Sequence, residues 1–348
     1  ENLIADFLAR RARGERVEPE EFARQNSGGD EGARTRILSA IRAAPRIDAT
    51  IALDAEAGGT VVLGKPTTSD ASTGRRIDNR YVVERQLGEG GFGVVYLVRD
   101  EVHRGNLRAL KTLHAQLAQD ADLSQRFRNE IITVKAISHR YVPRFHNDGA
   151  TGDGGLYYVM DYVDGVRLDD VLRKVGPLAP ERIVQLVRQI LDVLEFAHQK
   201  GVYHRDLKPA NIILVKAGTP EEEVRVLDFG IAKITSREGE FSEMESMHTM
   251  SGGAIGTPHY MAPEQVTGQG KVDGKTDLYA LGVIIYQMCS GRVPFTGKTS
   301  MEVAAARLTQ APPPLDEDTP EWLRTLVMRL LERQKDKRPG TEELRVQL

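Results

Sequence analysis

A glycine-rich segment between two strand-like stretches is the feature that most constrains the fold of this chain. Residues 87–95 read LGEGGFGVV and contain the pattern G-x-G-x-x-G. Glycine lets a backbone approach phosphate groups closely because it has no side chain. Dinucleotide-binding folds share this pattern, but they place a helix directly after the glycines. Here strand-like sequence follows the glycines, so we predict a β-hairpin that covers a phosphate-bearing ligand.

The periodicity of the sequence divides the chain into a small β-rich part and a larger helical part. Apolar and β-branched residues between turn signals predict strands at 81–87, 94–99 and 107–113. After about residue 180 the apolar residues recur at helical spacing, and they are Ile183, Leu186, Val187, Ile190, Leu191 and Leu194. We therefore predict an α+β domain of two lobes, with a ligand cleft between them.

The first 76 residues differ in composition from the rest. Residues 1–44 predict two or three short helices, one of which begins at Pro19, because two glutamates follow this proline. Two apolar faces support the helices, Leu3, Ile4, Phe7 and Leu8 in one and Ile37, Leu38 and Ile41 in another. Residues 45–76 are interpreted as a linker. The large domain is expected at 77–348, with its small lobe at about 77–163 and its large lobe at about 164–348.

Composition and charge exclude several classes of protein. The net charge is −3, which favours neither nucleic acid nor an anionic membrane as a partner. Cys289 is the only cysteine, which excludes an intrachain disulfide or a cysteine metal site and predicts a cytoplasmic location. No apolar run in the sequence approaches the ~18–20 residues of a membrane span. A membrane anchor beyond Leu348 stays an open alternative.

The strongest chemical signal is the run HRDLKPAN at residues 204–211. Asp206 is suited to accept the proton of a substrate hydroxyl and to orient its oxygen for in-line attack. Lys208 can neutralise charge on a transferred phosphate, and the amide oxygen of Asn211 suits Mg²⁺. The run is similar to the catalytic loop of eukaryotic-type (Hanks-type) serine/threonine protein kinases. The stretch DGVRL at 164–168 gives the closest resemblance to their bacterial PknB-like branch.

This resemblance extends from residue 79 to about residue 348. It implies a bilobal protein-kinase fold that binds ATP with Mg²⁺, or with Mn²⁺ as the alternative. It also implies that Lys111 grips the α- and β-phosphates and that Glu130, in a helical stretch, holds Lys111 by an ion pair. Asp228, in the motif Asp-Phe-Gly, would bridge the metal to the phosphates.

The resemblance further implies an adenine pocket. Met160 would be the gatekeeper beside the adenine, and the backbone of Asp161 and Val163 would form hydrogen bonds with the ring. The other implied ATP-binding residues are Leu87, Gly88, Gly90, Gly93, Val95, Ala109 and Ile213. Two positions depart from the usual family pattern, because Arg108 replaces an aliphatic residue and Asp161 replaces a glutamate.

Three residues of the large lobe are implied to support its structure. Glu264, in the motif Ala-Pro-Glu, is expected to pair with Arg338. Asp277 is expected to be buried and to brace the backbone of the catalytic loop.

Four residues are candidates for regulation and substrate docking. In the family, an arginine at the position of Arg205 is neutralised by a phosphate on the activation segment. Thr249 and Ser251 are the predicted autophosphorylation sites, and the alternative is that they are mobile loop hydroxyls. Thr257 is expected in the substrate-docking loop, where it would form hydrogen bonds with the catalytic aspartate and lysine.

The same motifs predict a serine/threonine kinase that acts on proteins. A lysine and a proline at 208 and 209 are typical of serine/threonine kinases, and the segment 256–264 favours a protein substrate. One alternative is a pseudokinase scaffold, but such proteins usually lack one of three residues that this chain retains, Lys111, Asp206 and Asp228. The other alternative is a small-molecule phosphotransferase, which is disfavoured because such enzymes lack the segment 256–264.

The role of the N-terminal region is open. Thr50, Thr60 and Thr67 each have a leucine or an aspartate three residues later. Phosphothreonines of this kind resemble ligands of forkhead-associated domains, and a chance match is the alternative. The preceding helices could dock on the kinase domain, form a homodimer or recruit substrate, and the sequence does not choose among these.

Overall fold

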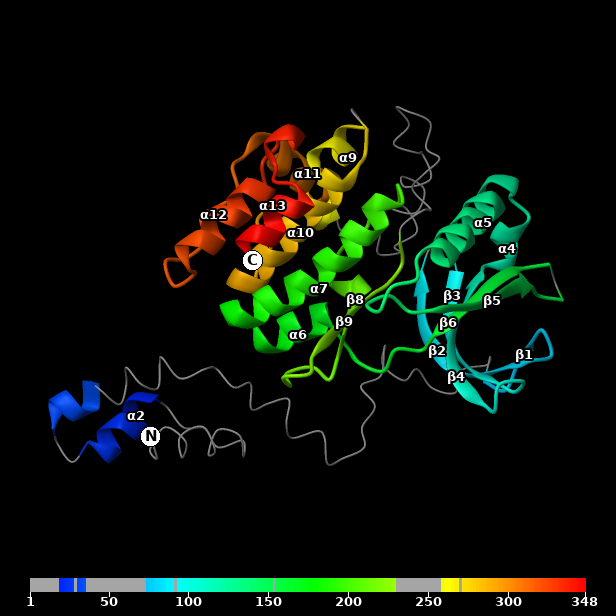
Figure 1. The fold of residues 1–348 in the computed structure, drawn as a ribbon, viewed down its shortest axis with the longest axis horizontal. Coiled ribbons are helices and arrows are strands. Elements are labelled where there is room, and N and C mark those ends of the chain that lie inside the picture. Colours follow the sequence, from blue (N-terminus) through cyan, green and yellow to red (C-terminus); the bar gives the residue numbers. More distant parts are fainter. Residues whose placement is uncertain are drawn as a thin grey trace. The chain divides into compact units, whose positions relative to one another are not determined.

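The chain forms two units in the computed structural model (Figure 1). One unit comprises Glu1–Val61 and Lys216–Glu222, and the other comprises Val62–Val215 and Glu223–Leu348. The structure describes residues 19–27, 30–35, 73–90, 93–152, 154–229, 258–268 and 271–348.

In the first unit, a helix starts where the sequence predicts one. Helix α2 spans Pro19–Asn26, and two glutamates occupy its first turn, where negative charge stabilises the helix dipole. Phe22 and Ala23 on this helix are buried. Residues 31–35 form a further helical turn. The predicted apolar faces at 3–8 and 37–41 lie outside the described residues.

The second unit begins with an antiparallel sheet of six strands in the order β1-β2-β3-β4-β6-β5. The strands are β1 (Arg76–Ile77), β2 (Tyr81–Gly90), β3 (Gly93–Asp100), β4 (Asn106–Leu113), β5 (Phe145–Ala150) and β6 (Leu156–Asp161). The three strands predicted from the sequence are therefore confirmed, each with longer bounds. The sheet also includes Arg76, which the prediction placed in the linker.

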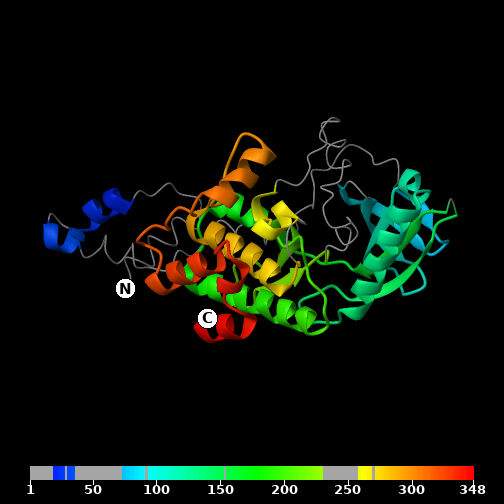
Figure 2. The ribbon, with the colours of Figure 1, turned by 90° about the horizontal axis from the view of Figure 1, so that it is seen from above.

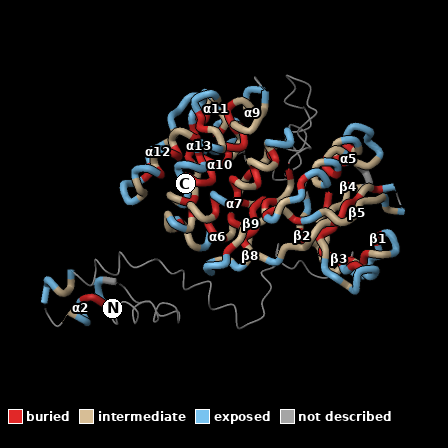
Figure 3. The backbone as a smooth tube through the Cα atoms, in the orientation of Figure 1, coloured by how far each residue is buried: buried red, intermediate tan, exposed pale blue. Residues whose placement is uncertain are grey.

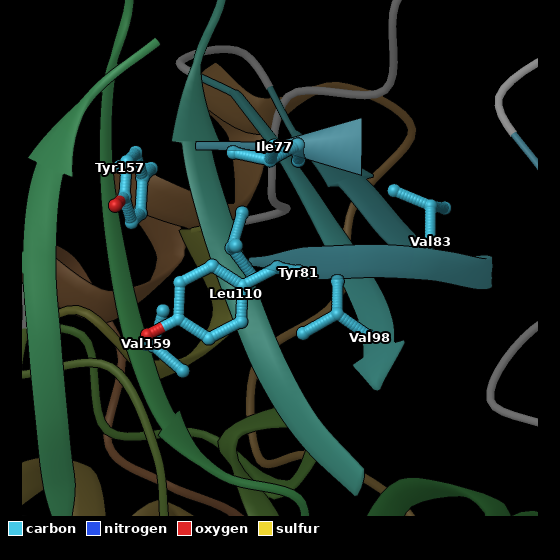
Figure 4. Close-up of a cluster of buried hydrophobic side chains, with 7 residues drawn as sticks. All are labelled: Ile77, Tyr81, Val83, Val98, Leu110, Tyr157 and Val159. Atoms are coloured by element: carbon cyan, nitrogen blue, oxygen red, sulfur yellow. The ribbon is translucent and has the colours of Figure 1, made fainter. Parts of the chain in front are cut away.

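One face of this sheet carries an apolar core, which Figure 4 shows in close-up. The buried side chains that form it are Ile77, Tyr81, Val83, Val98, Leu110, Tyr157 and Val159. The rings of Tyr81 and Tyr157 meet edge to face with their centroids 6.0 Å apart. Because side chains alternate between the faces of a strand, the neighbours of these residues in sequence lie on the opposite face.

Helix α5 (Ala121–Ala136) follows the short helix α4 (Ala115–Ala118) and packs near the sheet, as Figures 1 and 2 show. Asp120 caps α5 by accepting hydrogen bonds from the amides of residues 122 and 123. The buried residues of the helix recur at intervals of three and four, and they are Leu123, Phe127, Glu130 and Ile131. This spacing places Glu130, a charged residue, on the buried face.

The large lobe is helical, and α7 (Pro180–Gln199) and α10 (Gly274–Ser290) form its buried centre (Figure 3). All six apolar positions predicted in α7 are buried. Gly282 of α10 allows close packing on α12, because an added Cβ would lie 2.7 Å from the Cβ of Leu330. Burial raises the pKa of Cys289, near the end of α10, to about 12. The other helices are α6 (Leu168–Val175), α9 (Pro263–Thr267), α11 (Ser300–Thr309), α12 (Glu321–Leu330) and α13 (Thr341–Gln347).

A second sheet lies beside these helices, and the candidate catalytic motifs lie at its ends. Its strands are β7 (Val166–Arg167), β8 (Ile212–Val215) and β9 (Glu223–Val226), in the order β7-β8-β9. The turn η1 (Pro209–Asn211) leads directly into β8, and Asp228 follows β9 by two residues. None of the helices within the described ranges has the length and apolar character needed to cross a membrane.

Candidate active site

The first group of candidate residues centres on Lys111 of β4. Its Nζ atom donates a hydrogen bond to Oε1 of Glu130 at 2.7 Å, so the predicted ion pair is present. The hydroxyl of Tyr158, which is buried on β6, donates to the same oxygen at 2.7 Å. Burial alone would lower the pKa of Lys111, but the charges of Asp228 and Glu130 outweigh it and raise this pKa well above its ordinary value. Lys111 is therefore a charged ammonium group held in a largely buried position.

Asp228, a residue of the large lobe, contacts this group through Lys111. Its Oδ1 atom lies 3.3 Å from Nζ of Lys111. The amide of Leu227, the preceding residue, donates to the carbonyl of Asn211 at 2.8 Å, which places Asp228 next to the catalytic loop. The φ angle of Asp228 is 47°, in the left-handed region that non-glycine residues seldom occupy. Strained backbone of this kind concentrates at functional sites.

The second group lies on the loop at 204–211. Nζ of Lys208 donates to Oδ2 of Asp206 at 2.7 Å, and both side chains are 30% exposed. Nδ2 of Asn211 donates to the carbonyl of Asp206 at 2.9 Å and to its Oδ2 at 3.3 Å. The loop therefore presents a carboxylate and an ammonium side by side, and both are accessible to a substrate.

Asp277 of α10 fixes the backbone of this loop, as the sequence predicts. Its carboxylate is buried and accepts the amides of His204 and Arg205, each at 2.8 Å. Arg205 has a φ angle of 62°, so the carboxylate holds the loop at a second left-handed residue. Nε2 of His198 also donates to Asp277, at 2.8 Å. Sequence reasoning missed His198, because a lone histidine near the end of a helix carries no motif.

His204 is buried and joins the two groups. Its Nε2 atom lies 2.9 Å from the carbonyl of Leu227, and a carbonyl can only accept, so Nε2 carries a proton. Burial lowers the pKa of His204, which favours the neutral ring. The ring of Phe229 packs on it with the centroids 4.8 Å apart. Leu227 and Phe229, which flank Asp228, therefore both contact His204 of the catalytic loop.

Asn211 and Asp228 fit a divalent metal ion. Hydrogen bonds to Asp206 use the amide nitrogen of Asn211, which leaves its Oδ1 oxygen as a possible ligand. Asp228 supplies carboxylate oxygens. Hard cations such as Mg²⁺ prefer oxygen ligands of these two kinds.

An apolar cluster in the small lobe gathers several of the residues implied to surround adenine. It consists of Leu87, Val95, Leu97, Ala109, Met160 and Tyr162. Asp161 ends β6, and Val163 lies in the connection to β7. Ile213 is buried on β8 and is not a member of this cluster.

The glycines at 88 and 93 lie on a β-hairpin, as predicted, and Gly90 pairs with Gly93. A Cβ added at Gly93 would lie 1.8 Å from the carbonyl oxygen of Thr112, so no other residue fits there. Residues 91 and 92 lie outside the described residues.

The predicted pair of Glu264 and Arg338 is present and buried. The guanidinium donates two hydrogen bonds to the carboxylate, at 2.8 and 2.9 Å. Burial alone would raise the pKa of Glu264, but the bonds from Arg338 outweigh it and lower this pKa. Thr276, one residue before Asp277, donates to Oε1 of Glu264 at 2.9 Å, which connects the pair to α10.

Near the predicted substrate-docking segment (256–264), two residues that the sequence did not single out form hydrogen bonds. Nε2 of Gln265 donates to the carbonyl of Arg205 at 2.9 Å, so α9 contacts the catalytic loop. Nη2 of Arg307, which is buried on α11, donates to the carbonyl of His259 at 2.6 Å. The candidate regulatory residues Thr249, Ser251 and Thr257 lie outside the described residues.

A bilobal domain with these two groups, and with two oxygen-bearing side chains that fit a divalent metal ion, has the parts of a nucleotide-dependent phosphotransferase. Residues 81–347 match the sequence model of the family described as "Protein kinase domain". The chain therefore belongs to the protein kinase family.

The chain is also similar to named bacterial kinases. Serine/threonine-protein kinase pkn2 of Myxococcus xanthus is 40% identical over 268 residues, which are 76% of this chain and 31% of that protein. Serine/threonine-protein kinase pkn3 of the same organism is 36% identical over 280 residues, 79% of this chain and 50% of that protein. Serine/threonine-protein kinase PknB of Mycolicibacterium smegmatis is 36% identical over 286 residues, 80% of this chain and 44% of that protein. The matched part thus spans 31% to 50% of the length of these relatives.

Proposed function

We propose that this chain is a serine/threonine protein kinase that transfers the γ-phosphate of ATP to hydroxyl groups of proteins. The observation that carries the proposal is the pairing of Asp206 with Lys208 on a loop whose backbone is held by Asp277. The similar proteins named above, all serine/threonine-protein kinases, support the same reaction and acceptor.

In the proposed reaction, Asp206 orients the acceptor hydroxyl and takes its proton. The hydroxyl oxygen forms a bond to the γ-phosphorus, and the bond from that phosphorus to the β,γ-bridging oxygen breaks, so ADP leaves. Lys208, at 2.7 Å from Asp206, stabilises the negative charge on the transferred group. Asn211 keeps the carboxylate in place through its amide nitrogen.

The nucleotide is proposed to bind between the two lobes. Lys111 holds the α- and β-phosphates, and its pairing with Glu130 supports this role. Mg²⁺, with Mn²⁺ as the alternative, would be held by Asn211 and Asp228 and would neutralise phosphate charge. The apolar cluster around Ala109 would cover one side of the adenine ring. The remaining contacts are proposed from Gly88, Gly90, Gly93 and Ile213 and from the backbone of Asp161 and Val163.

A phosphate on the activation segment is proposed to regulate the enzyme through Arg205. Nε of Arg205 is buried and has no hydrogen-bond partner among the described residues, and burial lowers the pKa of the group. An anion beside it would compensate for the lost hydration. Thr249 and Ser251 are the proposed acceptors. Mass spectrometry after incubation with ATP tests this, and finding both residues unmodified contradicts it.

A second docking site is proposed in the linker. Phosphorylated Thr50, Thr60 or Thr67, which lie outside the described residues, would bind a forkhead-associated domain. Titration of the phosphorylated linker peptide with such a domain tests this proposal, with the unphosphorylated peptide as control. Binding that does not saturate contradicts it.

Transfer of labelled γ-phosphate from Mg·ATP to a generic protein and to the chain itself tests the main proposal. For Asp206→Asn we expect a loss of activity of about 10²- to 10⁴-fold, because the residue that takes the proton is removed. Asp192→Asn changes a half-exposed carboxylate on α7 and serves as the matched control, which keeps its activity. Absence of label with the wild type would favour the scaffold alternative. Transfer only to small hydroxyl compounds would favour a small-molecule phosphotransferase.

A further inference from the structure

Asp161, the last residue of β6, is held by contacts from three neighbouring segments. Its Oδ1 atom lies 3.0 Å from Nη1 of Arg108 on β4 and 2.6 Å from Nε2 of His146 on β5. Its Oδ2 atom accepts the amide of Arg144, just before β5, at 3.3 Å. Its own amide donates to the carbonyl of Arg144 at 2.9 Å. Both the side chain and the backbone of this residue are therefore fixed.

The arrangement of the sheet explains these contacts. Strand β6 lies between β4 and β5, and Arg108 is directly opposite Asp161 in the register. On the other side, the register of β5 shifts between Phe145 and Asn147, so His146 is the extra residue of a β-bulge. Bulges re-aim side chains, and here the histidine meets the carboxylate.

Arg108 and Asp161 both depart from the usual family pattern, and they contact each other. The side chain of Arg108 is 18% exposed and that of Asp161 is 40% exposed, so water only partly screens the pair. Arg108 has no other ion pair within the described part of the chain. An aliphatic residue at position 108 would leave Asp161 with His146 and the amide of Arg144 but without an arginine partner.

The pair lies directly behind the proposed adenine pocket. Ala109 and Met160, the next pair in the same register, belong to the apolar cluster that would cover adenine. Because side chains alternate between the faces of a sheet, Arg108 and Asp161 lie on the opposite face from this cluster. Leu110 and Val159, the following pair in the register, confirm the alternation, since both belong to the apolar core of the sheet shown in Figure 4. The contacts of Asp161 therefore fix the backbone at the edge of the pocket.

We propose that Arg108, Asp161 and His146 form an ionic clamp that positions the first residue after the gatekeeper and so sets the affinity of the cleft for adenine. They are positioning residues, because they act through the backbone of β6 and not by touching phosphate. The clamp rests on the proposed function, since it requires that nucleotide bind in this cleft.

Binding of ADP and of adenosine to the full chain, measured by calorimetry without turnover, tests the clamp. We expect Arg108→Glu and Asp161→Arg each to raise Kd about threefold to tenfold, because like charges then face each other. The double variant restores the ion pair in reverse but not the contacts with His146 and the amide of Arg144. Its Kd should therefore rise clearly less than the product of the two single changes predicts. The change should be equal for ADP and adenosine, because the clamp acts on the base. The KM for protein substrate should not change.

Arg99→Glu is the matched control. It reverses the charge of a surface ion pair in the same sheet, with Glu84 at 2.8 Å, and neither residue belongs to the apolar cluster around Ala109. It should leave Kd unchanged. If a charge reversal prevents folding, a double-mutant cycle can be measured with Arg108→Leu, Asp161→Asn and the variant that combines them.

Three results would overturn the clamp. Single variants that lower Tm but keep the wild-type Kd would make the contacts purely structural. A double variant with the summed losses of the singles would show that the side chains do not act as a pair. Wild-type protein that binds neither ADP nor adenosine would remove the proposed nucleotide site and the clamp together, whereas loss of the clamp alone leaves wild-type binding intact.

Discussion

The two halves of the candidate site are built differently. In the small lobe, Lys111 and Tyr158 are paired on neighbouring strands, and Glu130 of α5 meets both of them through its side chain. In the large lobe, Asp277 accepts two backbone amides of the catalytic loop, so the loop is fixed through its main chain. In the first half, the helix joins the sheet through side-chain contacts, whereas the second half is part of a buried backbone network.

This difference indicates which half of the site can move while the fold stays intact. Helix α5 can move away from β4 without the unfolding of a sheet or a helix, because side-chain contacts hold it there. These are the two hydrogen bonds of Glu130, the ion pair of Lys135 with Asp148 and the apolar packing of Phe127 and Ile131. The catalytic loop cannot move without exposing the buried carboxylate of Asp277 or its backbone partners. Control of activity is therefore expected to act on the small-lobe half, as helix and loop movements do in other switches.

The largest effect is expected for Asp277→Asn, which tests the fixed half. The new amide group would place a donor against donors in a buried site, at a cost of about 2–4 kcal/mol in the free energy of unfolding. Phosphotransfer should fall at least about 100-fold. Denaturant unfolding and phosphotransfer assays measure the two effects, and Asp192→Asn is the surface control. An active, destabilised variant would show that the loop keeps its shape without this carboxylate.

The next effect is expected for Glu130→Gln, which tests the movable half. Glutamine can still accept from Tyr158 but no longer neutralises Lys111, so kcat should fall about tenfold to 100-fold. The free energy of unfolding should fall by about 1–2 kcal/mol, less than for Asp277→Asn, because Asp228 still lies 3.3 Å from Lys111. Asp122→Asn, an exposed change on the same helix, should leave kcat unchanged. A stability loss as large as that of Asp277→Asn would remove the contrast between the halves.

A smaller effect is expected for Tyr158→Phe, which removes one oxygen atom. Loss of a hydrogen bond to a charged acceptor costs about 1.5–3 kcal/mol, and we expect kcat to fall about threefold to tenfold. Tyr157→Phe is a close control, because its hydroxyl donates to Asp78 at 2.5 Å on the other side of the sheet. It should lower Tm without lowering kcat. Equal kcat for the two variants would show that Tyr158 does not position Glu130.

The smallest effect is expected for Gln265→Met, which removes the bond from α9 to the carbonyl of Arg205 and a second bond, from the amide of Ala262 to Oε1 of Gln265. One such hydrogen bond contributes about 1 kcal/mol, and activity should fall about twofold to threefold. Initial rates with a protein substrate measure it. A loss above about 20-fold would mean that α9, and not Asp277 alone, holds the loop.

Contiguous motifs were the part of the site that sequence could predict. Asp206, Lys208 and Asn211 lie within one run of eight residues, so their proximity follows from the chain itself. The pairings of Glu130 with Lys111 and of Glu264 with Arg338 were predicted from a family resemblance, and both contacts are present. The strands and the main helix of the large lobe followed from apolar periodicity, because burial imposes it.

The remaining contacts depend on tertiary packing that no local pattern encodes. Tyr158 meets Glu130 across 28 residues, and His198 meets Asp277 across 79. The bulge that turns His146 toward Asp161 is likewise visible only in the register of the strands. Each of these polar groups lies in a buried or partly buried place, where an unpaired donor or acceptor is costly, so the folded structure selects its partner.

The raised pKa of Cys289 has a practical consequence for spectroscopy. Only the thiolate reacts readily with maleimides and iodoacetamides, and a pKa of about 12 leaves very little of it at neutral pH. The native chain is thus effectively free of reactive thiols. A cysteine introduced at an exposed position of α5, such as Ile132, would accept a fluorophore or spin label selectively. Movement of that helix during nucleotide binding can then be followed without first replacing the native cysteine.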